Sequence, residues 1–317
     1  MFKQRFLLIK SWGSDLWADV EHVMVQLLAA EIAGRIPVVF WGMDSINSNS
    51  STNAYELYFE QVSPCSVEDA IRPDFTYYPP IWNFSNVMTE DPDKLKWNYR
   101  DIGSMMASDA DVVVSDVHYP VTSFIPWIRG DHPMFGKTPH QIYRYLYGRY
   151  LKINPEVVNT LQAFINANPN FRDEKPIVGA HVRGNAFVHE VNQRYSANTF
   201  YAPNIWRFFN KYNARHLFLI TDSAAIVKEY KRQYFNDVLI VSDSKKRAFR
   251  GPVRQRNTNC PNQRDKDAEL VNDTFEVIKD AYLAVQCDFF VGNGYSSLSN
   301  TVLRLKNWPK TNIKLLY

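Results

Sequence analysis

Apolar residues in the second half of the chain form short runs that alternate with segments of helical spacing. The runs have the length of buried strands, and between them apolar residues recur every three or four positions, as in amphipathic helices. This alternation predicts a parallel sheet with helices on both faces. Strands are expected at 176–182, 216–221, 237–241 and 288–291, and helices at 223–234, 269–286 and 297–305.

The first half opens with the same alternation. Apolar runs at 5–10 and 36–41 predict two strands, and the apolar residues between them recur at helical spacing. Gly34 stands where the helix should end, a position that favours glycine. Together these segments have the size of a strand–helix–strand crossover.

The rest of the first half is less regular, and residues 43–98 predict long loops with short elements. The polar stretch 168–175 predicts a linker. We therefore expect two Rossmann-like α/β domains, 1–170 and 171–317. The remaining elements expected in the first domain are a strand at 111–115 and helices at 138–151 and 154–167.

Composition excludes some classes of protein. The net charge is +3, which is too small to favour nucleic acid as a partner. The three cysteines have no C-x-x-C spacing, which argues against a structural zinc site and fits a reducing compartment. No apolar run approaches the roughly 20 residues of a transmembrane helix. A cytoplasmic protein is expected, with peripheral attachment to a membrane left open.

The first candidate group of functional residues follows the strand at 176–182. His181 and Arg183 are two positions apart, so that both point to the same side of an extended segment. An arginine at a strand end offers a planar set of donors to a phosphate. A core histidine and a surface ion pair are the ordinary alternative for an isolated His-x-Arg.

Two further strand ends carry polar residues before a helix. Asp222 and Ser223 follow the second strand, and Ser296 and Ser297 follow a glycine-rich turn after the last one. Helix N-termini of this kind bind anions through backbone N–H groups. Ordinary helix capping by Asp222 or Ser223, and a plain turn before Ser296, are the alternatives.

Asp280 lies inside the predicted helix 269–286, beside its apolar stripe. A carboxylate close to a core needs hydrogen-bond donors. A pair of N–H groups on a nucleobase satisfies this need, and so does an arginine or a backbone group. The sequence leaves these alternatives open.

The motifs share an order with a known family. They read His-Val-Arg at 181–183, Thr-Asp-Ser at 221–223 and Asp-Ala-Tyr-Leu-Ala-Val-Gln-Cys-Asp-Phe-Phe-Val-Gly-Asn-Gly-Tyr-Ser-Ser at 280–297. This order resembles the fucosyltransferases of the nodulation and core α-1,6 type, with the protein O-fucosyltransferases as cousins. The resemblance is strongest over residues 176–306. It implies a GT-B fold with two Rossmann-like domains facing a central cleft, a GDP-fucose donor, inversion at the anomeric carbon and no metal.

The resemblance also implies residue roles. Arg183 would bind the donor diphosphate and support catalysis, and Glu190 lies one position from the proposed base of the core enzymes. The other donor-binding residues implied are His181, Asp222, Ser223, Asp280 for the nucleobase, Ser296 and Ser297 for the phosphates, and Gly13 in the opening unit.

Two departures from the family pattern change the expected charge. The core enzymes have a second arginine where this chain has Gly184, and a second aspartate where it has Ser223. Both changes remove a charged group near the donor. The basic stretch from Lys245 to Arg256 is a candidate source of compensating charge, with a solvated loop as its alternative.

The expected function is therefore that of a glycosyltransferase that needs no cofactor besides its nucleotide-sugar co-substrate and acts on a glycan acceptor. Three Asp-x-Asp pairs are present, but none follows an apolar strand, so a metal site is not expected. The alternatives are another donor such as UDP-xylose, a non-catalytic sugar-nucleotide or glycan-binding protein, and an epimerase or phosphorylase. The Asp-x-Asp pairs are at 91 and 93, 109 and 111, and 265 and 267.

Overall fold

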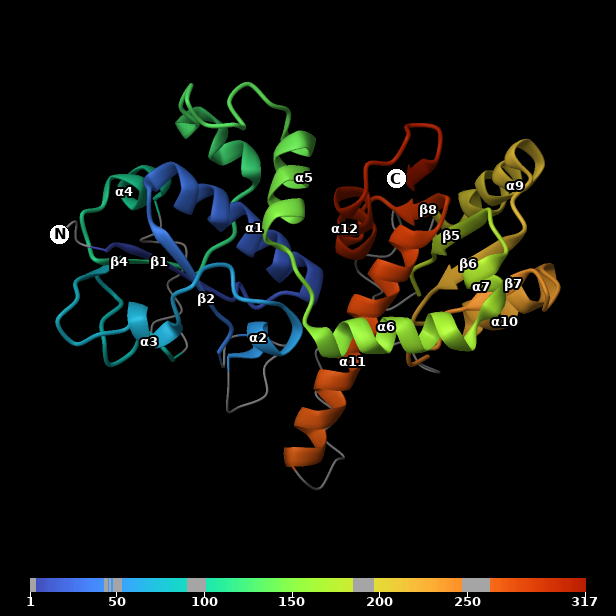
Figure 1. The fold of residues 1–317 in the computed structure, drawn as a ribbon, viewed down its shortest axis with the longest axis horizontal. Helices are drawn as coiled ribbons and strands as arrows, with labels where there is room; N and C mark the ends of the chain where they lie inside the picture. The colour runs from blue at the N-terminus through green and yellow to red at the C-terminus, as the bar shows by residue number, and fades with distance from the viewer. Residues whose placement is uncertain are drawn as a thin grey trace. The chain divides into compact units, whose positions relative to one another are not determined.

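The computed structural model of the chain contains two compact units, Met1–Asn154 and Pro155–Tyr317 (Figure 1). The division falls before α6, earlier than the boundary near residue 170 expected from the sequence. Each unit is built around its own parallel sheet. The structure describes residues 4–42, 45, 47, 53–89, 101–184, 197–246 and 263–317, without the side chains of 197 and 263–267.

The first unit holds a four-stranded parallel sheet in the order β2-β1-β4-β3. One face packs on a cluster that includes Phe6, Leu8 and Val114. Helix α1 contacts β1 and β2 and is itself covered by α5. The elements are β1 (Phe6–Lys10), α1 (Leu16–Ala33), β2 (Ile36–Phe40), α2 (Ala54–Tyr58), α3 (Val67–Ala70), β3 (Tyr77–Tyr78), α4 (Ile102–Ala107), β4 (Val112–Ser115), the 3₁₀ turns η1 (Val121–Ser123) and η2 (Ile125–Trp127), and α5 (Pro139–Tyr150).

Both ends of α1 follow from local sequence. The Asp15 carboxylate accepts a hydrogen bond from the N–H of Ala18 at 3.0 Å, which satisfies one of the free donors of the first turn. At the other end Gly34 has φ +63°, a left-handed conformation that glycine adopts without strain. The helix stop predicted at Gly34 is therefore confirmed.

The second unit holds a five-stranded parallel sheet in the order β7-β6-β5-β8-β9. The strand β5 is central and pairs with β6 and β8, so that Gly179 lies between Phe218 and Phe290. The elements are α6 (Pro155–Ala167), α7 (Pro169–Asp173), β5 (Ile177–His181), the 3₁₀ turn η3 (Ala197–Phe200), α9 (Tyr201–Tyr212), β6 (His216–Ile220), α10 (Ala224–Gln233), β7 (Leu239–Val241), α11 (Gln263–Gln286), β8 (Phe289–Asn293), α12 (Ser297–Leu305) and β9 (Ile313–Leu316).

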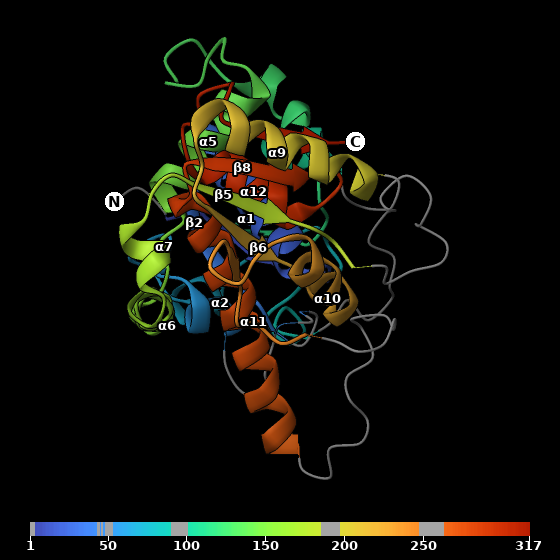
Figure 2. The ribbon, with the colours of Figure 1, turned by 90° about the vertical axis from the view of Figure 1, so that its right-hand side faces the viewer.

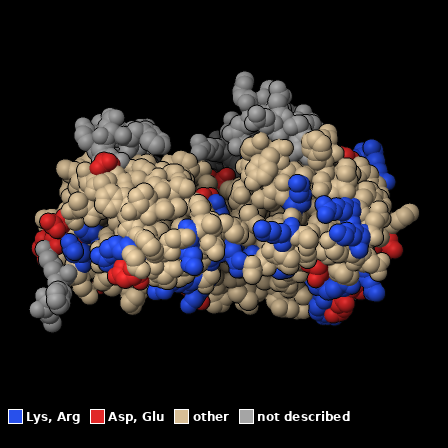
Figure 3. All heavy atoms as spheres, turned by 90° about the horizontal axis from the view of Figure 1, so that it is seen from above, with Lys and Arg blue, Asp and Glu red and all other residues tan. Residues whose placement is uncertain are grey.

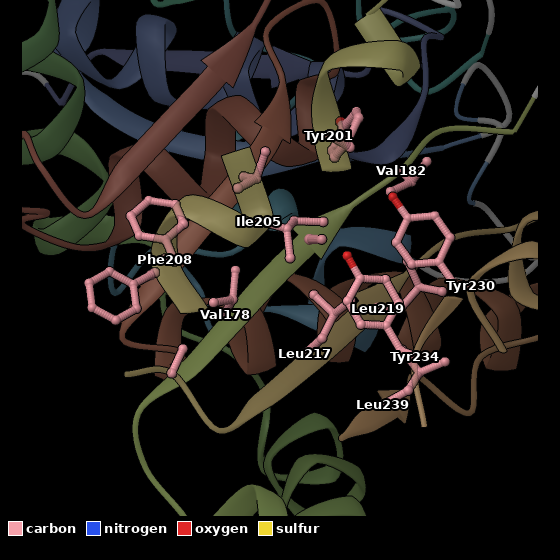
Figure 4. Packing of buried hydrophobic residues seen from close by; sticks show 14 of the residues in the cluster. Val178, Val182, Tyr201, Ile205, Phe208, Leu217, Leu219, Tyr230, Tyr234 and Leu239 are labelled. Atoms are coloured by element: carbon pink, nitrogen blue, oxygen red, sulfur yellow. The ribbon is translucent and has the colours of Figure 1, made fainter. Parts of the chain in front are cut away.

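Helices α9 and α10 cover one face of this sheet. Figure 2 shows α9 lying along β5 and β8, in agreement with its contacts. Figure 4 shows the core that results, in which Val178 and Leu217 from the sheet meet Ile205 and Phe208 from α9 and Tyr230 from α10. The alternation of residues along each strand thus sends every second side chain into this core.

The opposite face carries α6, α7, α11 and α12. Phe164 on α6, Phe171 on α7 and Phe218 on β6 form a cluster in which the ring centroids are 5.0–5.8 Å apart. All three side chains are buried. The stretch 168–175, expected as a linker, therefore contributes a helix and a core residue to the second unit.

Replacing Phe171 by alanine tests this placement of α7. The free energy of unfolding of the second unit should fall by about 3–5 kcal/mol, because the ring leaves a cavity between Phe164 and Phe218. Urea unfolding followed by circular dichroism measures the change. Phe235→Ala is the control, since Phe235 is 82% exposed and its loss should change the free energy by less than about 0.5 kcal/mol. Equal midpoints for Phe171→Ala and the parent chain would contradict the placement.

Candidate functional site

The candidate site lies at the carboxyl edge of the five-stranded sheet. Because all five strands are parallel, the loops that follow β5, β6, β7 and β8 emerge at this one edge. The three motifs that stand in the second half of the sequence follow β5, β6 and β8. The structure thus brings them to the same end of the second unit.

Residues after β5 and β6 contact each other directly. The N–H of Gly184 donates to Oδ1 of Asp222 at 3.1 Å. A Cβ atom at Gly184 would lie 2.6 Å from the same oxygen and 2.9 Å from Cβ of Ser223. No larger side chain fits at residue 184 while Asp222 holds this position. A second arginine at this position would require Asp222 and Ser223 to shift.

Arg183 is half-buried at the end of β5. Its carbonyl oxygen accepts a hydrogen bond from the amide of Asn198 at 3.3 Å. Across the described residues, its guanidinium forms neither an ion pair nor a hydrogen bond. The surface ion pair considered from the sequence is thus not formed there, and the group has all its donors available for an anion.

His181 is buried and held from two sides. Its Nδ1 atom lies 2.8 Å from Oγ of Ser299 on α12, and its carbonyl oxygen accepts a hydrogen bond from the Tyr201 hydroxyl at 2.5 Å. Burial, reinforced by the nearby charge of Arg183, lowers the pKa of His181 to about 4. The ring is therefore neutral at pH 7. It fixes β5 against α12 and supplies no positive charge.

The N-terminus of α12 follows β8. Ser296 occupies the N-cap position and is buried, but its side chain makes no capping hydrogen bond. Its carbonyl oxygen accepts from the amide of Asn300 at 2.9 Å. Ser297 is the first residue of the helix. This end of α12 presents a Ser296 hydroxyl that makes no capping bond, at a helix N-terminus of the kind that binds anions.

The end of β6 combines a helix cap with an exposed carboxylate. Ser223 is the N-cap of α10, and its Oγ accepts from the N–H of Ile226 at 3.4 Å. The capping alternative considered for Ser223 is therefore confirmed. Asp222 is exposed and receives the Gly184 N–H described above.

Asp280 lies on α11 and is buried. Oδ1 accepts from the Ser242 hydroxyl at 2.5 Å, and Oδ2 accepts from the Ser244 hydroxyl at 2.8 Å. Lys246 donates to the same Ser244 hydroxyl at 2.9 Å. Burial raises the pKa of Asp280 to about 6 against the opposing effect of these hydrogen bonds. The carboxylate fixes the loop that follows β7.

Sequence reasoning missed Ser242, Ser244 and Ser299, the hydroxyl partners of Asp280 and His181. Each comes within six residues after β7 or β8. A serine shortly after a predicted strand could have indicated a residue at the sheet edge. Serines are too common in loops, however, for their position alone to select these three. Their roles depend on pairings between distant segments, such as the 118 residues that separate His181 from Ser299.

Two predicted residues lie apart from this group. Gly13 belongs to the first unit, where it has φ +81° and donates its N–H to Oγ of Ser11 at 2.9 Å. Glu190 lies outside the described residues, as do residues 247–256 of the basic stretch from Lys245 to Arg256. Within that stretch, Lys245 forms an ion pair with Glu269 on α11.

No group of three potential metal ligands occurs among the described side chains. In the pair formed by Asp109 and Asp111, Asp109 is bonded to Arg5 and Asp111 accepts two hydrogen bonds from Thr76. The pairs at 91 and 93 and at 265 and 267 fall outside the side chains that the structure describes. Over the described helices, none has the length and apolar character needed to cross a membrane.

Comparison with known proteins identifies the fold. No family model and no curated protein sequence matches the chain. Its structure is similar to NodZ α-1,6-fucosyltransferase soaked with GDP-fucose, with a TM-score of 0.59 and 16% identity over 96% of this chain and 93% of that one. NodZ from Bradyrhizobium also matches, with a TM-score of 0.57 and 16% identity over 95% of this chain and 92% of that one.

Two other structures show the same likeness. FUT1 of Arabidopsis thaliana in complex with GDP has a TM-score of 0.57 and 10% identity over 96% of this chain and 69% of that one. POFUT1 in complex with GDP-fucose has a TM-score of 0.55 and 11% identity over 100% of this chain and 98% of that one. The α/β fold of the GT-B class, predicted from the motif order, is confirmed.

Asp280→Asn should change how stability depends on pH. A pKa raised from 3.8 to about 6 means that the folded state favours the protonated carboxyl, so this contribution to stability is complete below about pH 4 and is lost as the pH rises to about 6. Asparagine has no such titration. The variant should therefore gain stability relative to the parent chain between pH 4 and pH 7, by an amount on the order of 1–3 kcal/mol.

Urea unfolding at several pH values measures this difference. Asp237→Asn, at an exposed position of the same unit, is the matched control and should show no such trend. A stability difference between Asp280→Asn and the parent that stays constant from pH 4 to pH 7 would contradict the assignment.

Proposed function

We propose that the chain is a glycosyltransferase that moves a sugar from a nucleoside diphosphate donor, GDP-fucose in the first instance, to a hydroxyl of a glycan acceptor. The observation that carries this proposal is the uncommitted guanidinium of Arg183 at the same sheet edge as the α12 N-terminus with its buried Ser296. Two independent anion-binding groups at one edge suit a diphosphate. Similar structures that contain GDP-fucose or GDP support the choice of nucleotide.

The proposed reaction breaks the bond between the anomeric carbon and the diphosphate while the acceptor oxygen attacks from the opposite face. Negative charge grows on the diphosphate as that bond breaks. Arg183 and the N-terminus of α12, with Ser296 and Ser297, would stabilise this charge more in the transition state than in the ground state. His181 would act through its contact with Ser299, which holds β5 and α12 in register.

Asp280 and Asp222 complete the proposed donor site. Each Asp280 oxygen accepts one hydroxyl and retains capacity for a second donor, so we assign Asp280 to the nucleobase together with the loop it fixes. Asp222 would orient the donor by fixing the Arg183–Gly184 turn. We assign the acceptor base to Glu190 and expect no requirement for a metal ion.

A second candidate donor follows from Gly184. The chain has Gly184 where the related enzymes have a second arginine, so the charge around the donor differs from theirs. Because the donor site is changed, we carry UDP-xylose forward as the alternative donor.

The purified chain should bind GDP, and GDP-fucose should lose fucose to water or acceptor in its presence. Isothermal titration calorimetry with GDP, UDP and their sugars measures binding, and chromatography of the released nucleotide measures turnover. UDP binding with turnover of UDP-xylose would select the second donor. Absence of binding to every nucleotide tested would exclude the transferase. Nucleotide binding without turnover of any donor would favour a non-catalytic binding protein.

Arg183→Ala should lower kcat by about a hundred- to a thousandfold, because a lost donor to a developing anion costs roughly 2.7–4 kcal/mol. Arg183→Lys should restore only part of the rate, since a point charge lacks the planar pair of donors. Arg215→Ala is the matched control, because Arg215 is exposed at the opposite end of β6. An unchanged kcat for Arg183→Ala would remove Arg183 from the mechanism.

Transfer should continue in the presence of EDTA. The protein supplies positive charge to the diphosphate through Arg183, so a chelator removes nothing that the proposed reaction uses. Initial rates with and without EDTA, followed by addition of Mg²⁺ or Mn²⁺, test the point. Loss of activity in EDTA with recovery on addition of metal would show that the mechanism depends on a metal ion.

A further inference from the structure

Two large aromatic side chains stand exposed on the outer helices of the second unit. Trp206 on α9 is 48% exposed, and Phe235, just after α10, is 82% exposed. Neither takes part in the site at the carboxyl edge of the sheet. Exposed rings of this size cost free energy in water, so their exposure together on adjacent elements needs an explanation.

Trp206 is held rigidly in this position. Its ring stacks on Tyr234, with 5.7 Å between ring centroids and 22° between the ring planes, and lies 5.9 Å from the ring of Phe209. Tyr234 itself is buried against the core. Because the indole is already fixed by its neighbours, little side-chain entropy remains to be lost when its exposed face meets a partner.

The two helices near these rings also carry exposed cations. The two helices carry five exposed Lys and Arg side chains, whereas the exposed carboxylates on α10 and the turn after it are Glu229 and Asp237. Figure 3 shows Lys and Arg side chains on the visible surface of the second unit, with fewer Asp and Glu. The two helices and the turn after α10 therefore carry more exposed cations than exposed carboxylates. The five cations are Arg207, Lys211, Lys228, Lys231 and Arg232.

We propose that this surface of α9 and α10, defined by Trp206, Phe235 and the five cations, rests on a membrane that contains anionic lipids. Aromatic rings favour the interface between lipid headgroups and acyl chains, and cations are attracted to the negative surface. Three of the five cations are lysines, which are depleted at the centres of protein interfaces, and a protein partner is the alternative that the test must exclude. The proposal is independent of the donor site and concerns where the protein acts.

Vesicle sedimentation tests the proposal with the full chain. The protein should sediment with vesicles of phosphatidylcholine and phosphatidylserine, less with phosphatidylcholine alone, and less again as salt is raised. Lys228→Gln and Lys231→Gln should each weaken binding about fivefold, since one cation near an anionic surface contributes about 1 kcal/mol. Phe235→Ala should weaken it by about tenfold through the loss of apolar contact with lipid.

Matched variants in the first unit serve as controls. Phe135 is 58% exposed and Lys137 is exposed, so Phe135→Ala and Lys137→Gln remove the same groups from another surface and should leave binding unchanged. Melting temperatures of all five variants check that folding is intact. Equal sedimentation of Phe235→Ala and the parent chain would overturn the proposal. So would binding to RNA or heparin without binding to anionic vesicles.

Discussion

The parallel pairing of β5 with both β6 and β8 is the constraint on which the second unit depends. Two parallel strands cannot be joined by a tight turn. The chain must instead cross over one face of the sheet between one strand and the next. The crossovers bury both faces, and the polar ends of the strands are left at one edge. Gly179 in β5 lies close to Cys287 and Phe290, and a Cβ there would lie 3.1–3.4 Å from their atoms. The centre of the sheet is therefore packed closely on the side of α11 and α12.

That same packing explains the ionisation of the buried groups. His181 and Asp280 are both removed from water, and burial shifts their pKa values in opposite directions, toward the neutral form in each case. Both are nevertheless bonded to serine hydroxyls, which can donate or accept as needed. Arg183 and Asp222 thus lie at the rim of the sheet edge, whereas His181 and Asp280 are buried and held by serine hydroxyls.

Much of the fold could be predicted from the sequence, because strand and helix periods are local properties. The helix at 297–305 was predicted with its observed bounds, and the four strands of the second half lie within about two residues of their predicted ends. The helix α9 was missed although Tyr201, Ile205 and Phe208 have helical spacing. Pro203 argues against a helix in its interior, but a proline in the first turn, where it stands, is compatible with one. The short edge strand β9 was also missed, because no clear alternation of apolar and polar residues predicts it.

The candidate site could be predicted only in part. Strand ends followed by polar residues identified Arg183, Asp222 and Ser296, since parallel strands place such residues at one edge. The contact of Gly184 with Asp222 joins residues 38 positions apart and depends on how two loops meet. No local pattern encodes such a distance. The same reason hides the hydroxyl partners of the two buried groups.

The contact between Gly184 and Asp222 also limits how the chain can evolve. A Cβ atom at residue 184 would lie 2.6 Å from Oδ1 of Asp222 and 2.9 Å from Cβ of Ser223, so any larger residue there requires both neighbours to shift. The exposed Asp222 carboxylate can rotate away, but Cβ of Ser223 moves only with the backbone of the loop after β6. The residue tolerated at 184 therefore depends on the conformation of a loop that lies 38 positions further along the chain.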